Sequence, residues 1–296
     1  MSETGGIATR RGVLRGAGGL ALAAAAVPVA GVPARAAPAA EPWPRWEAHD
    51  PGSTRRLRHD AWGDFLARHR RIGGDAIARV AYGAVDAADR RSLEGYLDGL
   101  AGVPVSGLAR PEQFAFWVNL YNALTVAVVL RHWPVDTIRD IDISPGLFAD
   151  GPWGAEAVMV EGVALSLDDI EHRILRPVWR DPRVHYAVNC AALGCPDLAA
   201  VPFTAAETER LLAAGARAYV AHPRGSRVDG RGRLVVSSIY RWFREDFGGT
   251  EAGVIAHLRR HATAGKAERL ATADGIAGDG YDWTINAPDR SLDLEA

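Results

Sequence analysis

One stretch of the sequence decides the fold: Pro111 to Trp133, which reads PEQFAFWVNLYNALTVAVVLRHW. At about 100° per residue, its apolar side chains cover almost the whole circumference of a helix. Pro111 suits the first helical turn, and Glu112 suits the positive end of the helix dipole. A helix that is apolar all round is enclosed by other elements, so we expect this one to be the central core helix. Its length and its polar interruptions do not favour a membrane span.

Two asparagines interrupt this apolar surface. Asn119 and Asn122 are three residues apart, so they lie near one another on the helix. A buried amide without partners costs about 1–3 kcal/mol, so each asparagine needs hydrogen-bond partners. Either they fix the shape of a loop, or they contact a substrate or a catalytic residue.

Outward from the central helix, periodicity predicts further elements. Apolar residues recur at helical spacing over Trp62–His69 and Ala87–Leu100, and Ala157–Val163 is typical of a hairpin that turns at Glu161-Gly162. Downstream, we expect two short helices around residues 205–221 and a strand over residues 233–237. A helix capped by Ser237 or Ser238 and another helix over residues 253–261 follow.

A helix is predicted to begin at Ser166, because an acidic residue, Asp169, lies three positions later as in a capping box. We expect it to end before Pro177. Glu171 falls within the apolar stripe of this helix, whereas His172, Asp169 and Arg176 lie on the other side. A carboxylate directed at a core is costly unless it is paired or functional, so Glu171 is a candidate site residue.

Residues 183–189 alternate in polarity and predict a strand. His185 and Asn189 would share one face of this strand, which leads into a turn-like loop that contains Cys190 and Cys195. These are the two cysteines of the chain. If the strand runs straight, His185 and Cys190 point to opposite faces.

Four separated motifs resemble a known family: FWVNLYNA (116–123), SLDDIEHRILR (166–176), DPRVHYAVNC (181–190, with GCP at 194–196) and YRWFREDF (240–247). They are similar to the signatures of the family called domain of unknown function 547. The resemblance covers residues 60–286 and extends to the YDW near the C-terminus. It implies an α+β fold of the papain-like class, a single domain whose buried central helix packs against a small antiparallel sheet. Papain-like peptidases place their cysteine at the start of the central helix, where Gln113 stands here.

The family name implies a fold and a constellation of residues rather than a reaction, so several hypotheses stay open. We expect first a binding or scaffold domain with a buried polar network of Asn119, Asn122, Asn189, Asp169, Glu171 and the histidines. The alternative is a papain-like thiol hydrolase or transferase with Cys190 or Cys195 as nucleophile, His172 or His185 as base and Glu171 or an asparagine as orienting group. A disulfide between the cysteines, structural or redox-active, is a further possibility. The spacing of the cysteines and histidines is not a strong zinc pattern, so neither a metal nor a cofactor is predicted.

The N-terminus predicts export. Arg10-Arg11 precede an apolar run and the small-residue exit Ala34-Arg35-Ala36, a pattern typical of a twin-arginine signal over residues 1–36. Residues 37–58 are expected to form an extended lead-in and residues 59–290 a single globular domain. The protein would then be periplasmic, cell-surface or secreted, without a stable membrane span after cleavage.

Charge limits the partners. The chain has 34 basic and 36 acidic residues and a net charge of −2. Because it has no basic block, nucleic acid is not expected as a partner. A small molecule, a peptide or another protein remains open.

Overall fold

The enclosed helix predicted from the sequence is α3 (Arg110–His132) of the computed structural model, which describes residues 38–146, 150–229, 231–273 and 275–292. Every residue from Glu112 to Leu130 is buried. The expectation that its length does not favour a membrane span is wrong, because its 23 residues and mean hydropathy of 1.4 would suffice, but that apolar window is 100% buried inside the protein. The predicted signal over residues 1–36 lies outside the described residues, and the elements named from here on belong to the unit formed by residues 36–296.

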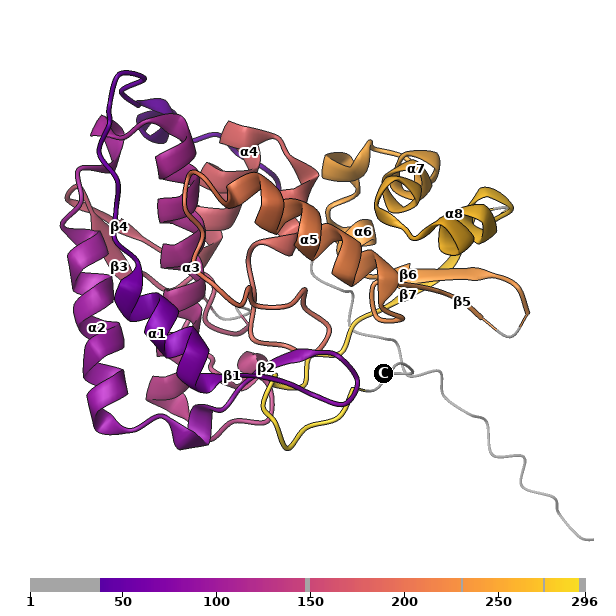
Figure 1. Ribbon diagram of the computed structural model, residues 1–296, viewed down its shortest axis with the longest axis horizontal. Helices are drawn as coiled ribbons and strands as arrows, with labels where there is room; N and C mark the ends of the chain where they lie inside the picture. The colour runs from indigo at the N-terminus through magenta and orange to yellow at the C-terminus, as the bar shows by residue number, and fades with distance from the viewer. Residues whose placement is uncertain (1–37, 147–149, 230, 274, 293–296) are drawn as a thin grey trace, which may run out of the picture. The chain divides into compact units, whose positions relative to one another are not determined.

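Other helices surround α3. It packs against α2 and α5 and against a π-helix over Asp169–Leu175, here called η5. Figure 1 shows α1, α2 and α3 in indigo and magenta on one side of this unit, and α5 running from them toward α6, α7 and α8. The helices are α1 (Asp60–His69), α2 (Ala87–Ala101), α3, α4 (Arg176–Trp179), α5 (Thr208–Ala221), α6 (Ile239–Trp242), α7 (Glu251–His261) and α8 (Ala264–Ala271).

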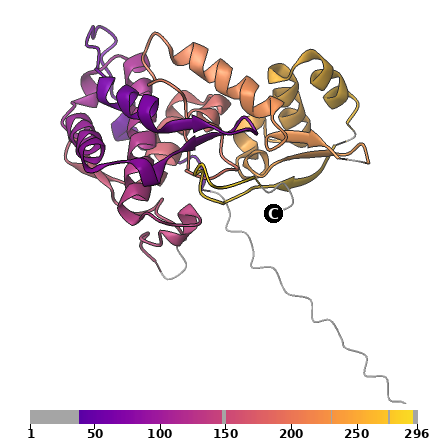
Figure 2. The same ribbon diagram turned by 60° about the horizontal axis from the view of Figure 1, so that its bottom comes forward.

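The strands are short and form three separate sheets. Two of these are antiparallel pairs, β1–β2 and β3–β4, and in the third β5 pairs antiparallel to β6 while β7 runs parallel to β6. In Figure 2 the gold helices α7 and α8 lie above this third sheet. The strands are β1 (Arg70–Ile72), β2 (Ala78–Val80), β3 (Val158–Val160), β4 (Val163–Leu165), β5 (Ser226–Val228), β6 (Leu234–Ser237) and β7 (Ile276–Gly280). The fold is therefore α+β, as predicted.

The buried residues form two hydrophobic clusters. The larger surrounds α3 and includes Trp46 from the lead-in, whose ring meets Trp117 edge-on at 5.2 Å. The smaller lies among α5, β6, α6 and α7 and contains Tyr186, Tyr219 and Tyr240. The cysteine loop lies where the two clusters meet, because Val188 and Ala191 belong to the first cluster and Tyr186 to the second.

The predicted strand over residues 183–189 is wrong. Residues Pro182–Tyr186 form a 3-10 helix, η6. Asp181 accepts a hydrogen bond from the Arg183 backbone N–H, and Pro182 occupies the first turn, so the Asp-Pro pair begins a helix here. The alternating pattern misled the prediction because Val184 to Asn189 are all buried, which leaves no solvent face.

The helix that begins at Ser166 does not end before Pro177, which corrects a second prediction. It continues as η5 and then as α4 to Trp179. Pro177 cannot donate to the Arg173 carbonyl, but that carbonyl accepts a hydrogen bond from Trp43 N–H at 3.2 Å instead. The lead-in thus replaces the helix bond that the proline removes.

Two further expectations need revision. The region 205–221 contains one helix, α5, preceded by a turn in which Thr204 Oγ1 accepts from Glu207 N–H. The sequence predicted no helix or strand after residue 261, but α8 and β7 lie there. The predicted hairpin is confirmed as β3–β4, and its turn residues Glu161 and Gly162 both have positive φ, which suits a tight two-residue turn.

Candidate functional site

The first group of candidate residues is an ion network between η5, α4 and η6 and a further 3-10 helix, η7 (Arg244–Phe247). His185 Nε2 lies 2.7 Å from Asp246 Oδ2, and His185 Nδ1 lies 3.5 Å from Glu171 Oε1. Arg176 Nε donates to the same Asp246 oxygen at 2.6 Å. The imidazole of His185 is thus held between two carboxylates, and its ring stacks on Phe243 at 4.4 Å.

The pKa values of this network follow from its charges. Burial would raise the pKa of Glu171, but the neighbouring His172, the hydrogen bond from His185 and the charge of Arg176 outweigh it and lower the pKa to about 2. Burial would lower the pKa of His185, yet its hydrogen bonds to Asp246 and Glu171 raise it. Burial lowers the pKa of His172 to about 4. At neutral pH His172 is therefore uncharged, and Glu171 is stabilised by the charge of Arg176 and by its contact with His185, whose pKa is raised.

Regular helix periodicity predicted that His172 and Arg176 lie on the outer face of the helix. This prediction is wrong. Both are buried, because the wider turn of the π-helix changes which residues face inward and because the lead-in covers them. Arg176 Nη1 donates to the Pro38 carbonyl at 2.8 Å, and the Glu41 N–H donates to the His172 carbonyl at 3.1 Å.

The second group is the cysteine loop, residues 189–196. Cys190 and Cys195 are both thiols, and their sulfurs lie 3.0 Å apart. Cys190 is half-buried and its sulfur lies 2.9 Å from the Tyr281 hydroxyl, whereas Cys195 is only 4% exposed. The Cys190 backbone N–H donates to the Cys195 sulfur at 3.0 Å. The next residue, Ala191, has a φ of 63°, a strained value for a residue with a Cβ.

The two thiols are not equivalent. The hydrogen bond from Cys195, with help from Tyr281 and the Ala192 backbone, lowers the pKa of Cys190 against the opposing effect of burial. Burial raises the pKa of Cys195 well above its ordinary value. The shared proton therefore belongs on Cys195, and the more exposed sulfur is the one that becomes a thiolate.

Asparagines fix the shape of this loop. Asn122 Nδ2 donates to the Ala187 carbonyl and its Oδ1 accepts from Asn189 N–H, both at 2.8 Å. Asn189 Nδ2 in turn donates to the Pro196 carbonyl at 2.7 Å, and its Oδ1 accepts from Ala191 N–H at 2.9 Å. The loop-fixing role expected for a central-helix asparagine is thus found at Asn122.

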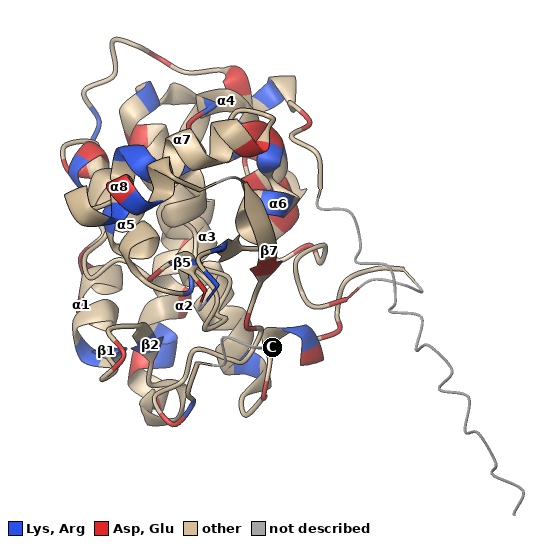
Figure 3. Ribbon diagram, turned by 90° about the vertical axis from the view of Figure 1, so that its right-hand side faces the viewer, with Lys and Arg blue, Asp and Glu red and all other residues tan. Residues whose placement is uncertain are grey.

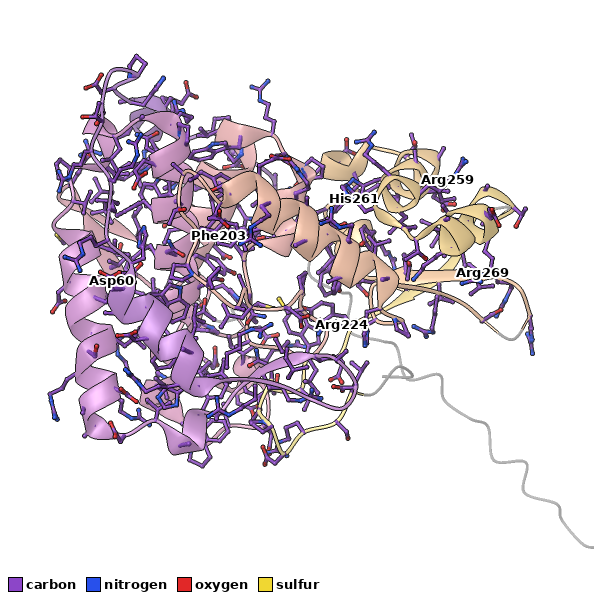
Figure 4. The ribbon with its side chains drawn as sticks, in the orientation of Figure 1. Asp60, Phe203, Arg224, Arg259, His261 and Arg269 are labelled. Atoms are coloured by element: carbon purple, nitrogen blue, oxygen red, sulfur yellow. The ribbon has the colours of Figure 1, made fainter. Side chains whose placement is uncertain are left out.

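The other end of the loop is tied to the tail and to α5. Leu193 N–H and Gly194 N–H donate to the carbonyls of Thr284 and Asp282. Arg224, labelled in Figure 4 just after α5, donates to the Leu193 carbonyl at 2.9 Å, and Tyr219 Oη donates to the Gly194 carbonyl at 2.6 Å. The sulfurs therefore lie in a loop whose backbone is held on every side.

Two predicted site residues, Asn119 and Asp169, and the papain-position residue Gln113 hold backbone or cap a helix rather than contact the sulfurs. Asn119 binds the backbone of Phe203, labelled in Figure 4, through both its amide nitrogen and its oxygen. Asp169 caps its own helix through Ser166 and pairs with Arg173. Gln113, at the position of a papain-like cysteine, donates to the carbonyls of Ala48 and Val105 and so holds the lead-in.

The structure does not join the histidines to the cysteines. Within the described ranges, neither sulfur hydrogen-bonds an imidazole, and no three His, Cys, Asp or Glu side chains gather where they could hold a metal ion. Tyr121 lies near both groups: its pKa is raised well above its ordinary range by burial, then by the charge of Glu171 and by the two cysteines. Glu171 also acts on Cys190 and opposes the loss of its proton.

The sequence reasoning missed Asp246, Tyr281 and Tyr121 as site residues. Asp246 and Tyr281 stand in the family-like motifs YRWFREDF and YDW, which was a usable signal, because polar residues inside such motifs often carry the site. Tyr121 is adjacent in sequence to Asn122 and gave no separate signal.

A family model described as "Protein of unknown function, DUF547" matches residues 105–220. The chain carries a DUF547 domain. The match spans α3, η5, η6, the cysteine loop and α5, so it contains both cysteines and Glu171, His172 and His185. Asp246 and Tyr281 complete the site from outside the matched residues of the DUF547 domain. Comparison with curated proteins and with solved structures returned no match.

Proposed function

We propose that this DUF547 domain carries out thiol–disulfide exchange at Cys190 and Cys195. The observation that carries the proposal is the 3.0 Å separation between the sulfurs of a half-buried cysteine, Cys190, and a buried one, Cys195, with the Tyr281 hydroxyl beside the Cys190 sulfur. Exchange needs one accessible sulfur that attacks and a second that resolves the intermediate. It needs no imidazole base, because the thiolate itself is the nucleophile.

The reaction balances with a substrate disulfide R–S–S–R′ as oxidant. The Cys190 thiolate attacks one substrate sulfur, a bond forms between Cys190 and that sulfur, and R′S⁻ leaves and takes a proton from solvent. Cys195 then gives up its proton to solvent and attacks the Cys190 sulfur, and RS⁻ leaves. The substrate disulfide is reduced by two electrons, and the Cys190–Cys195 pair is oxidised by two. The same steps in reverse transfer a disulfide to a substrate dithiol.

The sulfurs need only a small movement to bond. A disulfide has an S–S distance of about 2.05 Å, so the gap must close by roughly 1 Å. The strained backbone at Ala191 and the many hydrogen bonds to the loop hold the two sulfurs together in the reduced state. Export by the twin-arginine route is part of the proposal, because it would place this pair in an oxidising compartment.

The test uses the purified full chain and its thiols. Thiols are counted in the native and unfolded protein after reduction and again after oxidation with glutathione disulfide, and mass spectrometry maps the product. We expect two thiols before oxidation, none after it, a loss of two hydrogens and a Cys190–Cys195 bond that dithiothreitol reduces in the folded protein. Cys195→Ala should accumulate the mixed disulfide at Cys190, whereas Cys190→Ala should not form one.

Two outcomes contradict the proposal. In one, the folded protein keeps both thiols under oxidant; in the other, a Cys190–Cys195 bond forms that dithiothreitol reduces only after unfolding. Either would favour a second candidate, a binding or scaffold domain. The observation that favours this candidate is that Asn122 and Asn189 use their amide groups to fix backbone. A hydrolase is less well supported, because the histidines pair with carboxylates rather than with a sulfur.

A further inference from the structure

A group of aromatic side chains stands beside the Cys190 sulfur. The rings of Trp242, Tyr281 and Trp283 lie 4.6–5.6 Å apart, and all three are half-buried. We call these three residues the aromatic wall. Because the Tyr281 hydroxyl is 2.9 Å from the Cys190 sulfur, the wall lies beside this sulfur.

The wall is fixed relative to the cysteine loop. Gly194 N–H donates to the Asp282 carbonyl and Leu193 N–H to the Thr284 carbonyl, each at 2.8 Å. The ring of Trp283 is further supported by Trp153, which meets it edge-on at 5.6 Å. Rings that are held in place but not fully covered offer a preformed apolar surface, which lowers the entropic cost of binding.

The charges around the wall do not suit an anionic ligand. Arg139 lies over the Trp283 ring but donates to Asp150 at 2.6 Å. Arg241, next to Trp242, pairs with Asp279 at 3.1 Å, and Figure 3 shows the blue of α6 close to the red of β7. Each of these arginines is thus neutralised by its own carboxylate. The negative charge of ionised Glu171 also acts on Cys190.

We infer that the substrate sulfur belongs to a polypeptide cysteine with aromatic neighbours, which pack on Trp242 and Trp283 while Cys190 attacks. This inference rests on the proposed thiol–disulfide exchange and names its substrate class. Aromatic rings 4.5–7 Å apart attract one another beyond their area burial, and a neutral peptide meets no repulsion from Glu171. A small anionic disulfide such as that of glutathione gains neither advantage.

The test compares two synthetic pentapeptides as substrates of the reduced full-length protein. One carries tryptophan and phenylalanine on either side of its cysteine, and the other carries serine and glycine there. Both are supplied as mixed disulfides with 5-thio-2-nitrobenzoate, so the leaving group is the same and its release is followed by absorbance. We expect the aromatic peptide to react about tenfold faster.

The matched variants are Trp242→Leu and Trp179→Leu. Trp179 is also half-buried, but its ring packs on Phe114 instead. Trp242→Leu should bring the ratio of the two rates close to one, and Trp179→Leu should keep it near ten. Circular dichroism confirms that each variant is folded; if Trp242→Leu is not, the ratio in the unsubstituted protein decides.

The outcomes separate the two levels of the proposal. Equal rates for both peptides, with release still dependent on Cys190, overturn the substrate class and leave thiol–disulfide exchange standing. A ratio near ten that Trp242→Leu does not change also overturns it. No Cys190-dependent release with either peptide overturns the exchange reaction itself.

Discussion

The Tyr281 hydroxyl and the Cys190 sulfur lie 2.9 Å apart, although 91 positions separate the two residues in the chain. The pKa of Tyr281 is raised well above its ordinary value, first of all by burial, so its hydroxyl keeps its proton across the usual pH range. A neutral hydroxyl in this position can only stabilise the thiolate form of Cys190 by donating to it. This relationship makes the tail segment 281–283 part of the site.

Removing that hydroxyl should make Cys190 less reactive. Tyr281→Phe deletes a donor to a charged acceptor, so we expect alkylation by iodoacetamide at pH 7 to slow by about tenfold and its midpoint to move to higher pH. Tyr96→Phe is the control, because that hydroxyl binds His59 at 2.6 Å. An unchanged midpoint in Tyr281→Phe would show that the hydroxyl does not stabilise the thiolate.

Glu171 should control stability in acid. Its pKa falls from the ordinary 4.5 to about 2 on folding, so its stabilisation is complete above pH 4.5 and is lost as the pH drops toward 2. Glu171→Gln should destabilise the protein by about 3 kcal/mol at pH 7 and flatten the fall in unfolding free energy below pH 4.5. The measurement is urea denaturation across pH, with the exposed Glu94→Gln as control. If both variants keep the full acid slope, Glu171 is not the group responsible.

His172 should give a separate slope at higher pH. Burial lowers its pKa from 6.5 to about 4, so the folded protein binds its proton less readily than the unfolded chain does. Stability is therefore unaffected above pH 6.5 and is lost as the pH falls from 6.5 to 4, by about 3 kcal/mol in all. In the same urea titrations, His172→Gln should reduce the loss between pH 6.5 and 4 by about 3 kcal/mol, while the loss due to His59 and His257, whose pKa values burial lowers to about 4 and about 3, stays in place. An unchanged slope between pH 6.5 and 4 would contradict the assignment.

Alanine substitutions of Asn189 and Asn119 should distinguish an asparagine that holds the cysteine loop from one that holds the core elsewhere. Asn189→Ala leaves the Pro196 carbonyl and the Ala191 N–H without partners, so we expect a loss of about 3 kcal/mol and faster alkylation of Cys195. Asn119→Ala removes the partners of Phe203 and should cost a similar amount while alkylation of Cys195 is unchanged. Mass spectrometry after brief iodoacetamide treatment gives the modification at each cysteine. Equal exposure of Cys195 in both variants would mean that the loop is not held by Asn189.

The sequence was sufficient where one physical signal dominated. The enclosed helix, the buried stripe of α2 and the Glu161-Gly162 turn each followed from periodicity or turn chemistry. The burial of Glu171 also followed, because its place in an apolar stripe requires a partner. Its partner His185 was among the candidate bases, whereas the second carboxylate of His185, Asp246, could not be predicted, because it is 61 positions away and meets His185 only through the fold.

Other features depended on tertiary contacts that override the local sequence pattern. Residues 183–189 alternate like a strand, but Asp181 and Pro182 begin a 3-10 helix and every residue from Val184 is buried. α8 and β7 lie in a polar tail, where β7 gains its order by pairing with β6. The carboxylate partners of the histidines likewise come from elements that only the packed fold brings together.

The π-helix Asp169–Leu175 has a consequence for changes in chain length. A π-type turn contains roughly one more residue than an α-turn, so it amounts to a one-residue insertion in an ordinary helix. Removing a single residue after His172 would let the segment return to α geometry with the downstream residues in place, whereas inserting one would rotate them by about 100°. Arg176 would then turn away from Asp246, and the Arg173 carbonyl would no longer face Trp43. This helix can tolerate substitutions, but a shift of its register by one position would separate Asp246 from Arg176.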